Sequence, residues 1–162
     1  MMTYLQNFTL GSVSSKNEAN IMIKNAVDII FASLGFWVCG YGFSYGQHPI
    51  YSNGFNGFGD FFTDSKDPEN FGSLFSKYFF KLSFATTAST IVSGAMAERT
   101  KLRAYMFFSF LSMLTYSLPA HWMWSKSGFL RKLGAVDIAG CGPVHLSGGV
   151  SALVATIILK PR

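Results

Sequence analysis

Four long runs of apolar residues divide the sequence, and polar or charged segments separate them. The runs cover residues 21–45, 75–97, 104–124 and 136–159. Each provides the roughly 20 residues that an α-helix needs to cross the hydrocarbon core of a bilayer. The run 104–124 contains no Asp, Glu, Lys or Arg, so it lacks the polar face that a helix of a soluble bundle shows to water. The pattern therefore predicts an all-α, multi-pass membrane protein with four transmembrane helices.

The composition favours the same fold class. Hydrophobic residues make up 49% of the 162 residues and charged residues only 13%, against about 25% charged residues in soluble proteins. The formal net charge is +5, but the basic residues are scattered through short loops and form no single patch. This distribution disfavours a nucleic-acid partner. The expected partner is the lipid bilayer.

The distribution of charge also predicts an orientation. Four crossings place both chain ends on one side of the membrane, together with the loop 98–103. Basic residues are more frequent on this side, and short basic loops face the cytoplasm, so we expect the loop 46–74 to be extracellular. That loop is rich in Gly, Asn and Phe, which is typical of turns and irregular chain. It fits a vestibule and a plain exposed connection equally well.

Asp137 and His145 are two ionisable residues within the fourth apolar run. Such side chains are costly inside a bilayer and mark pathways for polar cargo, so they predict transport. Gly and Pro residues around His145 favour an interrupted helix. His145 is interpreted either as a structural hydrogen-bonding residue or as a proton acceptor and relay. For Asp137, capping of backbone N–H groups is preferred over contact with the cargo.

Aromatic residues form a second signal, with Phe79, Phe80 and Phe84 in the second run and Trp122 and Trp124 ending the third. Tryptophans at such positions are typical of the aromatic belts at membrane interfaces. Alternatively, aromatic ring faces attract a cation that leaves water. The loop 46–74 leads into the run that contains Phe84, and Trp124 ends its run on the same side. We therefore expect both side chains to face an outer mouth.

Charged residues on the expected helices have structural interpretations. Lys24 and Asp28 are four residues apart, which predicts an ion pair on one helical face. Lys77 and Lys81 begin the second run and are expected to extend toward the membrane surface. The sequence pairs no nucleophile with a base and contains no phosphate-binding loop or metal-ligand spacing. We therefore expect no enzyme, no cofactor and no metal site.

Several ordered motifs resemble those of the ammonium transporter (Amt/Rh) family, and of its Amt branch in particular. They are GSVSSKNE from Gly11, FA at Phe84 with IVSGA and AER up to Arg99, AHWMW ending at Trp124, and DIAG from Asp137 with VH ending at His145. The resemblance implies eleven membrane helices in two inverted five-helix halves, and trimers with one pore in each subunit. By this comparison the chain holds helices two to five, so we expect a fragment of a plasma-membrane protein.

The resemblance also implies roles for individual residues. Phe84 matches the outer phenylalanine gate, and Phe80 matches the aromatic residue one turn before it. Trp124 matches the tryptophan of the external cation site, and Asp137 the essential acid near that site. His145 matches the first of two pore histidines.

One position departs from the family, because Lys81 stands where Gln is usual, and a fixed cation there is expected to weaken cation recruitment. The intact protein is expected to transport ammonium or ammonia, with recruitment at the outer aromatic site and passage along a histidine-lined pore, while this chain alone is expected to be inactive. One alternative is a truncated, non-transporting subunit that regulates or poisons full-length trimers. Another is an intramembrane enzyme with Asp137 and His145 as acid and base, for which the sequence supplies no nucleophile.

Overall fold

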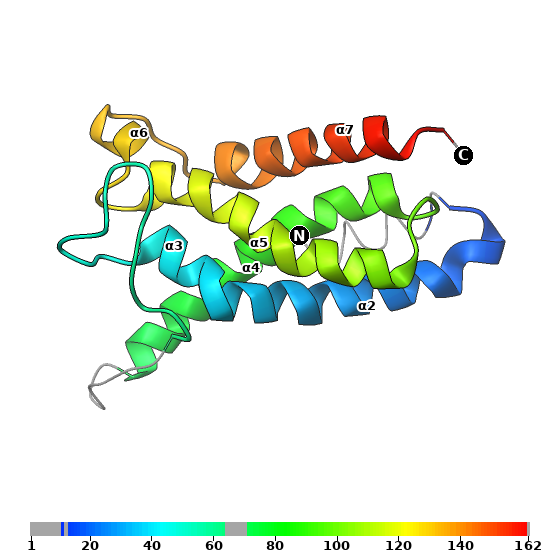
Figure 1. Ribbon diagram of the computed structural model, residues 1–162, viewed down its shortest axis with the longest axis horizontal. Helices are drawn as coiled ribbons and strands as arrows, with labels where there is room; N and C mark the ends of the chain where they lie inside the picture. Colours follow the sequence, from blue (N-terminus) through cyan, green and yellow to red (C-terminus); the bar gives the residue numbers. More distant parts are fainter. Residues whose placement is uncertain (1–10, 12, 64–70, 162) are drawn as a thin grey trace.

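The computed structural model describes residues 11, 13–63 and 71–161. Within these residues, four long helical segments run roughly along the long axis of the molecule (Figure 1). The all-α prediction is confirmed, and the β-structure of the described residues is a single bridge between Gln47 and Phe58. The elements in order are η1 (Ser15–Asn17), α2 (Glu18–Gly35), η2 (Phe36–Gly40), α3 (Tyr41–Tyr45), α4 (Phe71–Met96), α5 (Leu102–Trp124), α6 (Phe129–Lys132), η4 (Cys141–Leu146) and α7 (Ser147–Leu159).

The long segments pack as neighbours, with α2 against α4 and α5, and α7 against α4. The loop 46–63, α6 and the start of η4 gather at one end of the bundle, on the left in Figure 1. We call this the loop end. The connection between α4 and α5, the start of α2 and the end of α7 lie at the opposite end. Segments far apart in sequence therefore meet at the loop end.

A glycine allows α2 to approach α5 closely. A Cβ atom on Gly35 would lie 2.5 Å from the backbone oxygen of Phe110, a distance that real Cβ atoms do not tolerate. Small residues at such contacts let two helix backbones approach each other, as is common between helices in membranes. Next to this contact, the buried ring of Phe36 packs against the rings of Tyr41, Tyr78 and Tyr116.

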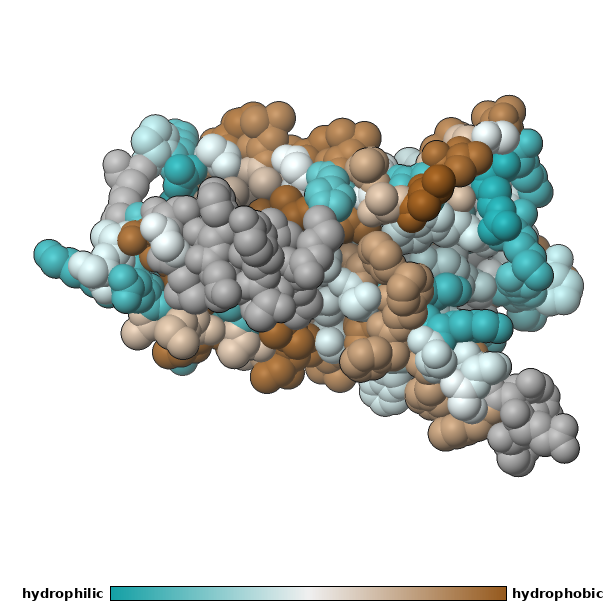
Figure 2. Space-filling model, turned by 180° about the vertical axis from the view of Figure 1, so that it is seen from behind, coloured by the Kyte–Doolittle hydropathy of each residue, from teal (hydrophilic) through white to brown (hydrophobic). Residues whose placement is uncertain are grey.

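Polar and apolar side chains are distributed in the opposite way from a soluble protein. Many hydroxyl-bearing residues of α4 and α5 are buried, whereas large apolar residues such as Phe107 (73% exposed) and Ile158 (71% exposed) face outward. Figure 2 shows hydrophobic residues along the middle of one face and hydrophilic residues mainly toward the two ends. A bundle of this kind suits a lipid environment, because exposure of its apolar outer surface to water would be unfavourable. The buried hydroxyl residues are Thr86, Thr87, Ser89, Thr90, Ser93, Ser109, Ser112 and Ser117.

Two helical segments, Ser15–Tyr45 and Cys141–Leu159, are long and apolar enough to cross a membrane by length and composition. The helices α4 and α5 have 26 and 23 residues, which also suffices in length. Their inward-facing Ser and Thr residues lower the hydropathy of both helices. That α4 and α5 cross the bilayer therefore stays a prediction.

The helix boundaries differ from the predicted runs at two places. The fourth run was predicted to be helical from residue 136, but helix begins only at Cys141, because Gly140 adopts a left-handed conformation with φ of 82°. The predicted loop 46–74 is too long at its end, because α4 begins at Phe71. Residues 64–70 of that loop lie outside the described residues.

The predicted ion pair between Lys24 and Asp28 is wrong. The ammonium group of Lys24 donates to the backbone oxygens of Ala97 and Thr100, 2.7 Å from each, where α4 has just ended. A cation is favourable there because the last carbonyls of a helix lack intrahelical donors. The buried Asp28 carboxylate accepts hydrogen bonds from hydroxyls of α4 and α5 instead. The donors are Ser89 (2.6 Å), Thr90 (3.0 Å) and Ser109 (2.7 Å).

A buried histidine of α5 holds the loop 46–63 onto the bundle. His121 Nδ1 lies 2.9 Å from the backbone oxygen of Ser44, and Nε2 lies 2.9 Å from that of Asn53. The indole of Trp122 also donates to the backbone oxygen of Phe55 at 2.8 Å. The loop is therefore fixed above the ends of α3 and α5, next to the cavity described below.

Candidate functional site

A cavity of about 230 Å³ opens at the loop end of the bundle. Its lining combines aromatic rings with one charged side chain. The lining comes from α3, α4, α5 and the segment before η4. The fold therefore brings Tyr45 and Ile138, which are 93 residues apart in the sequence, to the same cavity. The lining residues are Tyr45, Phe80, Lys81, Phe84, Trp124 and Ile138.

Three of the predicted site residues form a continuous aromatic wall in this cavity. Phe80 and Phe84 are one helical turn apart on α4, and their ring centroids lie 5.1 Å apart at an interplanar angle of 72°. The ring of Phe84 meets that of Trp124 in the same edge-to-face manner, at 5.5 Å and 66°. A ring face carries the partial negative charge that attracts a cation, so an aromatic wall of this kind suits a cation site.

Trp124 is fixed at both its backbone and its side chain. Its indole Nε1 donates to the backbone oxygen of Asp137 at 3.1 Å, and its own backbone oxygen accepts from the Arg131 guanidinium at 2.8 Å. Arg131 belongs to α6, which follows the turn after α5. The short helix α6 and the segment before η4 therefore determine the direction of the indole ring.

Asp137 organises the start of η4 rather than lining the cavity. One carboxylate oxygen accepts from the backbone N–H groups of Gly140 (2.5 Å) and Cys141 (3.1 Å), and the other from Gly142 (2.7 Å). These donors include the first N–H groups of a helix, which have no intrahelical partner. Asp137 thus caps the helix, as its preferred sequence interpretation states.

These contacts also set the protonation of Asp137. Partial burial acts to raise the pKa of the carboxyl group, but the backbone donors of residues 139–142 outweigh it and lower the pKa below the usual range. Asp137 is therefore a carboxylate at neutral pH. Asp137 directly precedes Ile138 in the sequence, and Ile138 lines the cavity.

His145 lies apart from the aromatic wall. Its Nδ1 is 3.1 Å from the backbone oxygen of Gly140, and its side chain is exposed on η4. The Gly140 oxygen also accepts from the backbone N–H groups of Val144 and His145, four and five residues further along the chain, as the π-helical turn η4 requires. The structure brings Phe80, Phe84 and Trp124 together, whereas His145 faces outward from the described helices.

Sequence reasoning missed two lining residues, Tyr45 and Ile138, and misplaced a third. Lys81 does not extend toward the surface, because its ammonium nitrogen lies 3.4 Å from the ring centroid of Tyr45. Tyr41 and Tyr45 are one helical turn apart, a spacing that marks a common face. That spacing was the available signal, but it does not tell which neighbouring helix the face meets.

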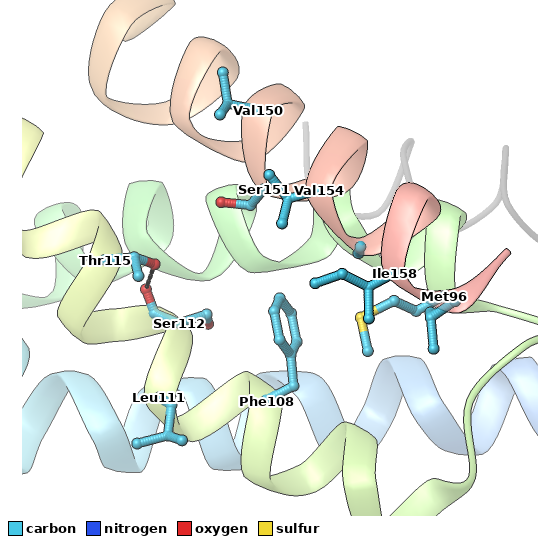
Figure 3. A pocket seen from close by; sticks show the side chains of 11 residues that line it. Met96, Phe108, Leu111, Ser112, Thr115, Val150, Ser151, Val154 and Ile158 are labelled. Atoms are coloured by element: carbon cyan, nitrogen blue, oxygen red, sulfur yellow. Dashed lines mark hydrogen bonds between the residues drawn. The ribbon is translucent and has the colours of Figure 1, made fainter.

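A larger groove of about 440 Å³ lies between α5 and α7. Phe108 stands between the two helices in this groove, and the hydroxyl of Thr115 donates to the backbone oxygen of Ser112 (Figure 3). The lining contains no ionisable side chain. It is therefore an apolar packing surface. Its lining residues are Met96, Phe108, Leu111, Ser112, Thr115, Val150, Ser151, Val154, Ala155, Ile158 and Leu159.

The solved structures that the chain resembles include a protein described as a "Sensor Amt Protein". The TM-score is 0.84 at 33% sequence identity, over 99% of this chain and 42% of that protein. Mep2 of Saccharomyces cerevisiae gives a TM-score of 0.70 at 30% identity, over 85% of this chain and 32% of Mep2. The helices of this chain are therefore arranged as in one part of these larger proteins.

Related sequences also point to ammonium transporters. The chain is 51% identical to the putative ammonium transporter 3 of Caenorhabditis elegans, over 94% of this chain and 23% of that protein. It is 38% identical to ammonium transporter 1 member 2 of Arabidopsis thaliana, over 94% of this chain and 31% of that protein. The chain thus spans about a quarter to a third of the length of these relatives. The profile of the Ammonium Transporter Family matches residues 1–162, so the chain belongs to this family of membrane-embedded transporters, which are not enzymes.

Proposed function

We propose that the intact transporter to which this chain contributes moves ammonium or ammonia across the membrane, and that the cavity at the loop end recruits the cation. The observation that carries this proposal is the aromatic wall of Phe80, Phe84 and Trp124, in a chain of the ammonium transporter family. An aromatic ring face attracts a cation by about 0.5–1 kcal/mol at an exposed site and by about 2 kcal/mol once water is excluded. Phe80 is 65% exposed in the described part of the chain, so the larger value requires the further helices of the intact transporter. The carboxylate of Asp137 adds negative potential beside the same mouth.

The chemistry of the cargo suggests how transport proceeds beyond this mouth. Ammonium carries only hydrogen-bond donors, and its removal from water favours the neutral form, ammonia. Ammonia then passes an apolar conduit that excludes hydrated potassium. A neutral imidazole at His145 offers one donor and one acceptor, so it suits either the wall of such a conduit or a proton relay.

His145 acquires this role only with further helices, because its side chain is exposed in the described part of the chain. The exposed apolar face of α7, with Leu153 (59% exposed) and Ile157 (67% exposed), also requires a cover. We infer that this chain alone conducts nothing and that the intact transporter is a homotrimer of the plasma membrane with one pore in each subunit. In that assembly, the loop between α3 and α4 faces the cell exterior and both ends of the chain face the cytoplasm.

The test uses a chimera in which this chain replaces the matching segment of the C. elegans putative ammonium transporter 3. Radiolabelled methylammonium uptake is measured in yeast cells that lack their own ammonium transporters. We expect uptake by the chimera and none by the chain expressed alone, with surface expression of both verified. Uptake by the short chain, or an inactive chimera beside an active parent transporter, contradicts the proposal.

A second candidate function is that of a non-transporting subunit that regulates or poisons full-length transporters. The apolar groove between α5 and α7 favours it, because this surface is open and able to pack against another helix. Co-expression of the chain with the parent transporter tests the idea. Co-purification together with reduced methylammonium uptake supports it, whereas unchanged uptake and no association exclude it.

A further inference from the structure

Lys81 places a covalently tethered ammonium group inside the cavity that we propose as the cation mouth. Its Nζ lies 3.4 Å from the ring centroid of Tyr45 and 5.3 Å from that of Tyr41. The Lys81 side chain lines the cavity together with Phe84 and Trp124. Lys81 is the only formally charged residue among the lining residues. The cavity therefore already contains a cation on an aromatic face.

The platform under Lys81 is rigid. Tyr41 and Tyr45 are 5% and 9% exposed, and their ring centroids lie 5.6 Å apart on one face of α3. Tyr78 packs on the ring of Tyr41 at 5.4 Å. Buried rings that contact one another keep their orientation, so the aromatic surface that binds the ammonium group is preorganised. Within the described part of the chain, Lys81 makes no direct ion pair with a carboxylate, and Asp60 attracts it only electrostatically.

An alkylammonium group and a free ammonium ion use the same interactions, namely donor N–H groups and attraction to ring faces. The Lys81 ammonium is covalently held, so its local concentration in the cavity is constant and high. It acts on an incoming cation in two ways, by occupying a ring face and by like-charge repulsion. Both effects lower the occupancy of the mouth by a diffusible cation.

We propose that Lys81 is a built-in competitor that lowers the affinity of this mouth for ammonium and alkylammonium ions. The inference rests on the proposed function, because it assigns affinity control to the same cavity. It makes Lys81 a residue that determines the working concentration range of the transporter. The residue raises the KM and leaves the later steps of passage unaltered.

The experiment compares three variants of the chimera. Lys81→Gln removes the tethered cation but keeps a polar side chain, and Lys81→Arg keeps the charge. Lys77→Gln is the matched control, because it removes a positive charge one turn earlier on α4, at an exposed position. We expect Lys81→Gln to lower the KM for methylammonium roughly tenfold with a similar maximal rate. The KM of the Lys81→Arg and Lys77→Gln chimeras should remain near that of the unaltered chimera.

A second measurement separates this inference from the proposed function. Equilibrium binding of radiolabelled methylammonium to the purified chimera in lipid nanodiscs reports the mouth without transport. Tighter binding by Lys81→Gln with no uptake in any variant supports the inference and refutes the proposed function. Uptake with an unchanged or raised KM in Lys81→Gln, or a shift equal to that of Lys77→Gln, overturns the inference and leaves the proposed function standing. Absence of measurable binding and uptake in every variant overturns both.

Discussion

The indole nitrogen of Trp124 donates a hydrogen bond to the backbone oxygen of Asp137 at 3.1 Å. The carboxylate of the same aspartate accepts the N–H groups that begin η4. One residue thus links the aromatic wall to the helix that carries His145. The position of the ring at the proposed mouth and the start of the helix that carries His145 are therefore coupled through Asp137.

This coupling predicts the effect of removing the Asp137 carboxylate. Asp137→Ala removes the acceptor of the N–H groups at the start of η4. The turn whose backbone oxygen binds Trp124 then loses its support, so we expect methylammonium uptake by the chimera to be abolished. Loss of such a cap typically costs about 1 kcal/mol of stability. Asp137→Asn keeps one oxygen acceptor and should retain partial uptake. Unchanged uptake in Asp137→Ala would remove this residue from the mechanism.

The pKa of Asp137 predicts how stability depends on pH. Its pKa in the folded protein is below the unfolded value of about 3.9. The capping contribution is therefore complete above about pH 4 and is lost as the pH falls through the folded pKa. We expect the stability difference between the chimera and its Asp137→Ala variant to be constant from pH 5 to pH 8 and to shrink below pH 4. A difference that already changes between pH 5 and pH 8 contradicts the assignment.

Asp28 should be important for the stability of the bundle rather than for transport selectivity. Asp28→Ala removes the acceptor shared by the hydroxyls of Ser89 and Ser109, which then lie buried without this partner. We expect a loss of about 1–3 kcal/mol in the free energy of unfolding. Asp28→Asn is the control, since it keeps an acceptor oxygen and should lose less. Unfolding by SDS in mixed micelles measures both variants, and equal stability of all three proteins refutes the role.

A glycine pair tests the close approach of the helices. Gly35→Ala places a methyl group against the Phe110 backbone oxygen, which forces α2 and α5 apart and should cost about 1–3 kcal/mol. Gly149→Ala, in the interior of α7, meets open space in the described structure and should be neutral or slightly stabilising. Thermal unfolding of the two chimera variants compares them. A Gly35→Ala variant as stable as Gly149→Ala contradicts the packing described.

The sequence was sufficient to predict the long helices, because apolar runs of this length have few alternatives. It was not sufficient to predict contacts between helices. Lys24 and Asp28 have the spacing of an ion pair, yet each binds groups of other helices that no local pattern reveals. The predicted helix start at residue 136 was wrong because an apolar run does not show that Gly140 turns left-handed.

The candidate site was likewise only partly predictable from the sequence. Motif resemblance identified Phe80, Phe84 and Trp124, and the structure places them in one cavity. Their roles in recruitment stay predictions until transport is measured. Tyr45 and the inward direction of Lys81 depended on how α3 packs against α4, which single-sequence patterns do not encode. A role of His145 in passage stays a prediction, because its side chain is exposed in the described part of the chain.

The most direct test of the central claim is potassium competition against methylammonium uptake in the chimera and its Trp124 variants. Trp124→Leu removes the aromatic face, so we predict that potassium inhibits uptake at roughly tenfold lower concentration than in the unaltered chimera. Trp124→Phe keeps a smaller aromatic ring and loses the hydrogen bond to Asp137, so its sensitivity should lie between the two. Equal inhibition of all three proteins by potassium would contradict the claim that this aromatic cavity selects the cation.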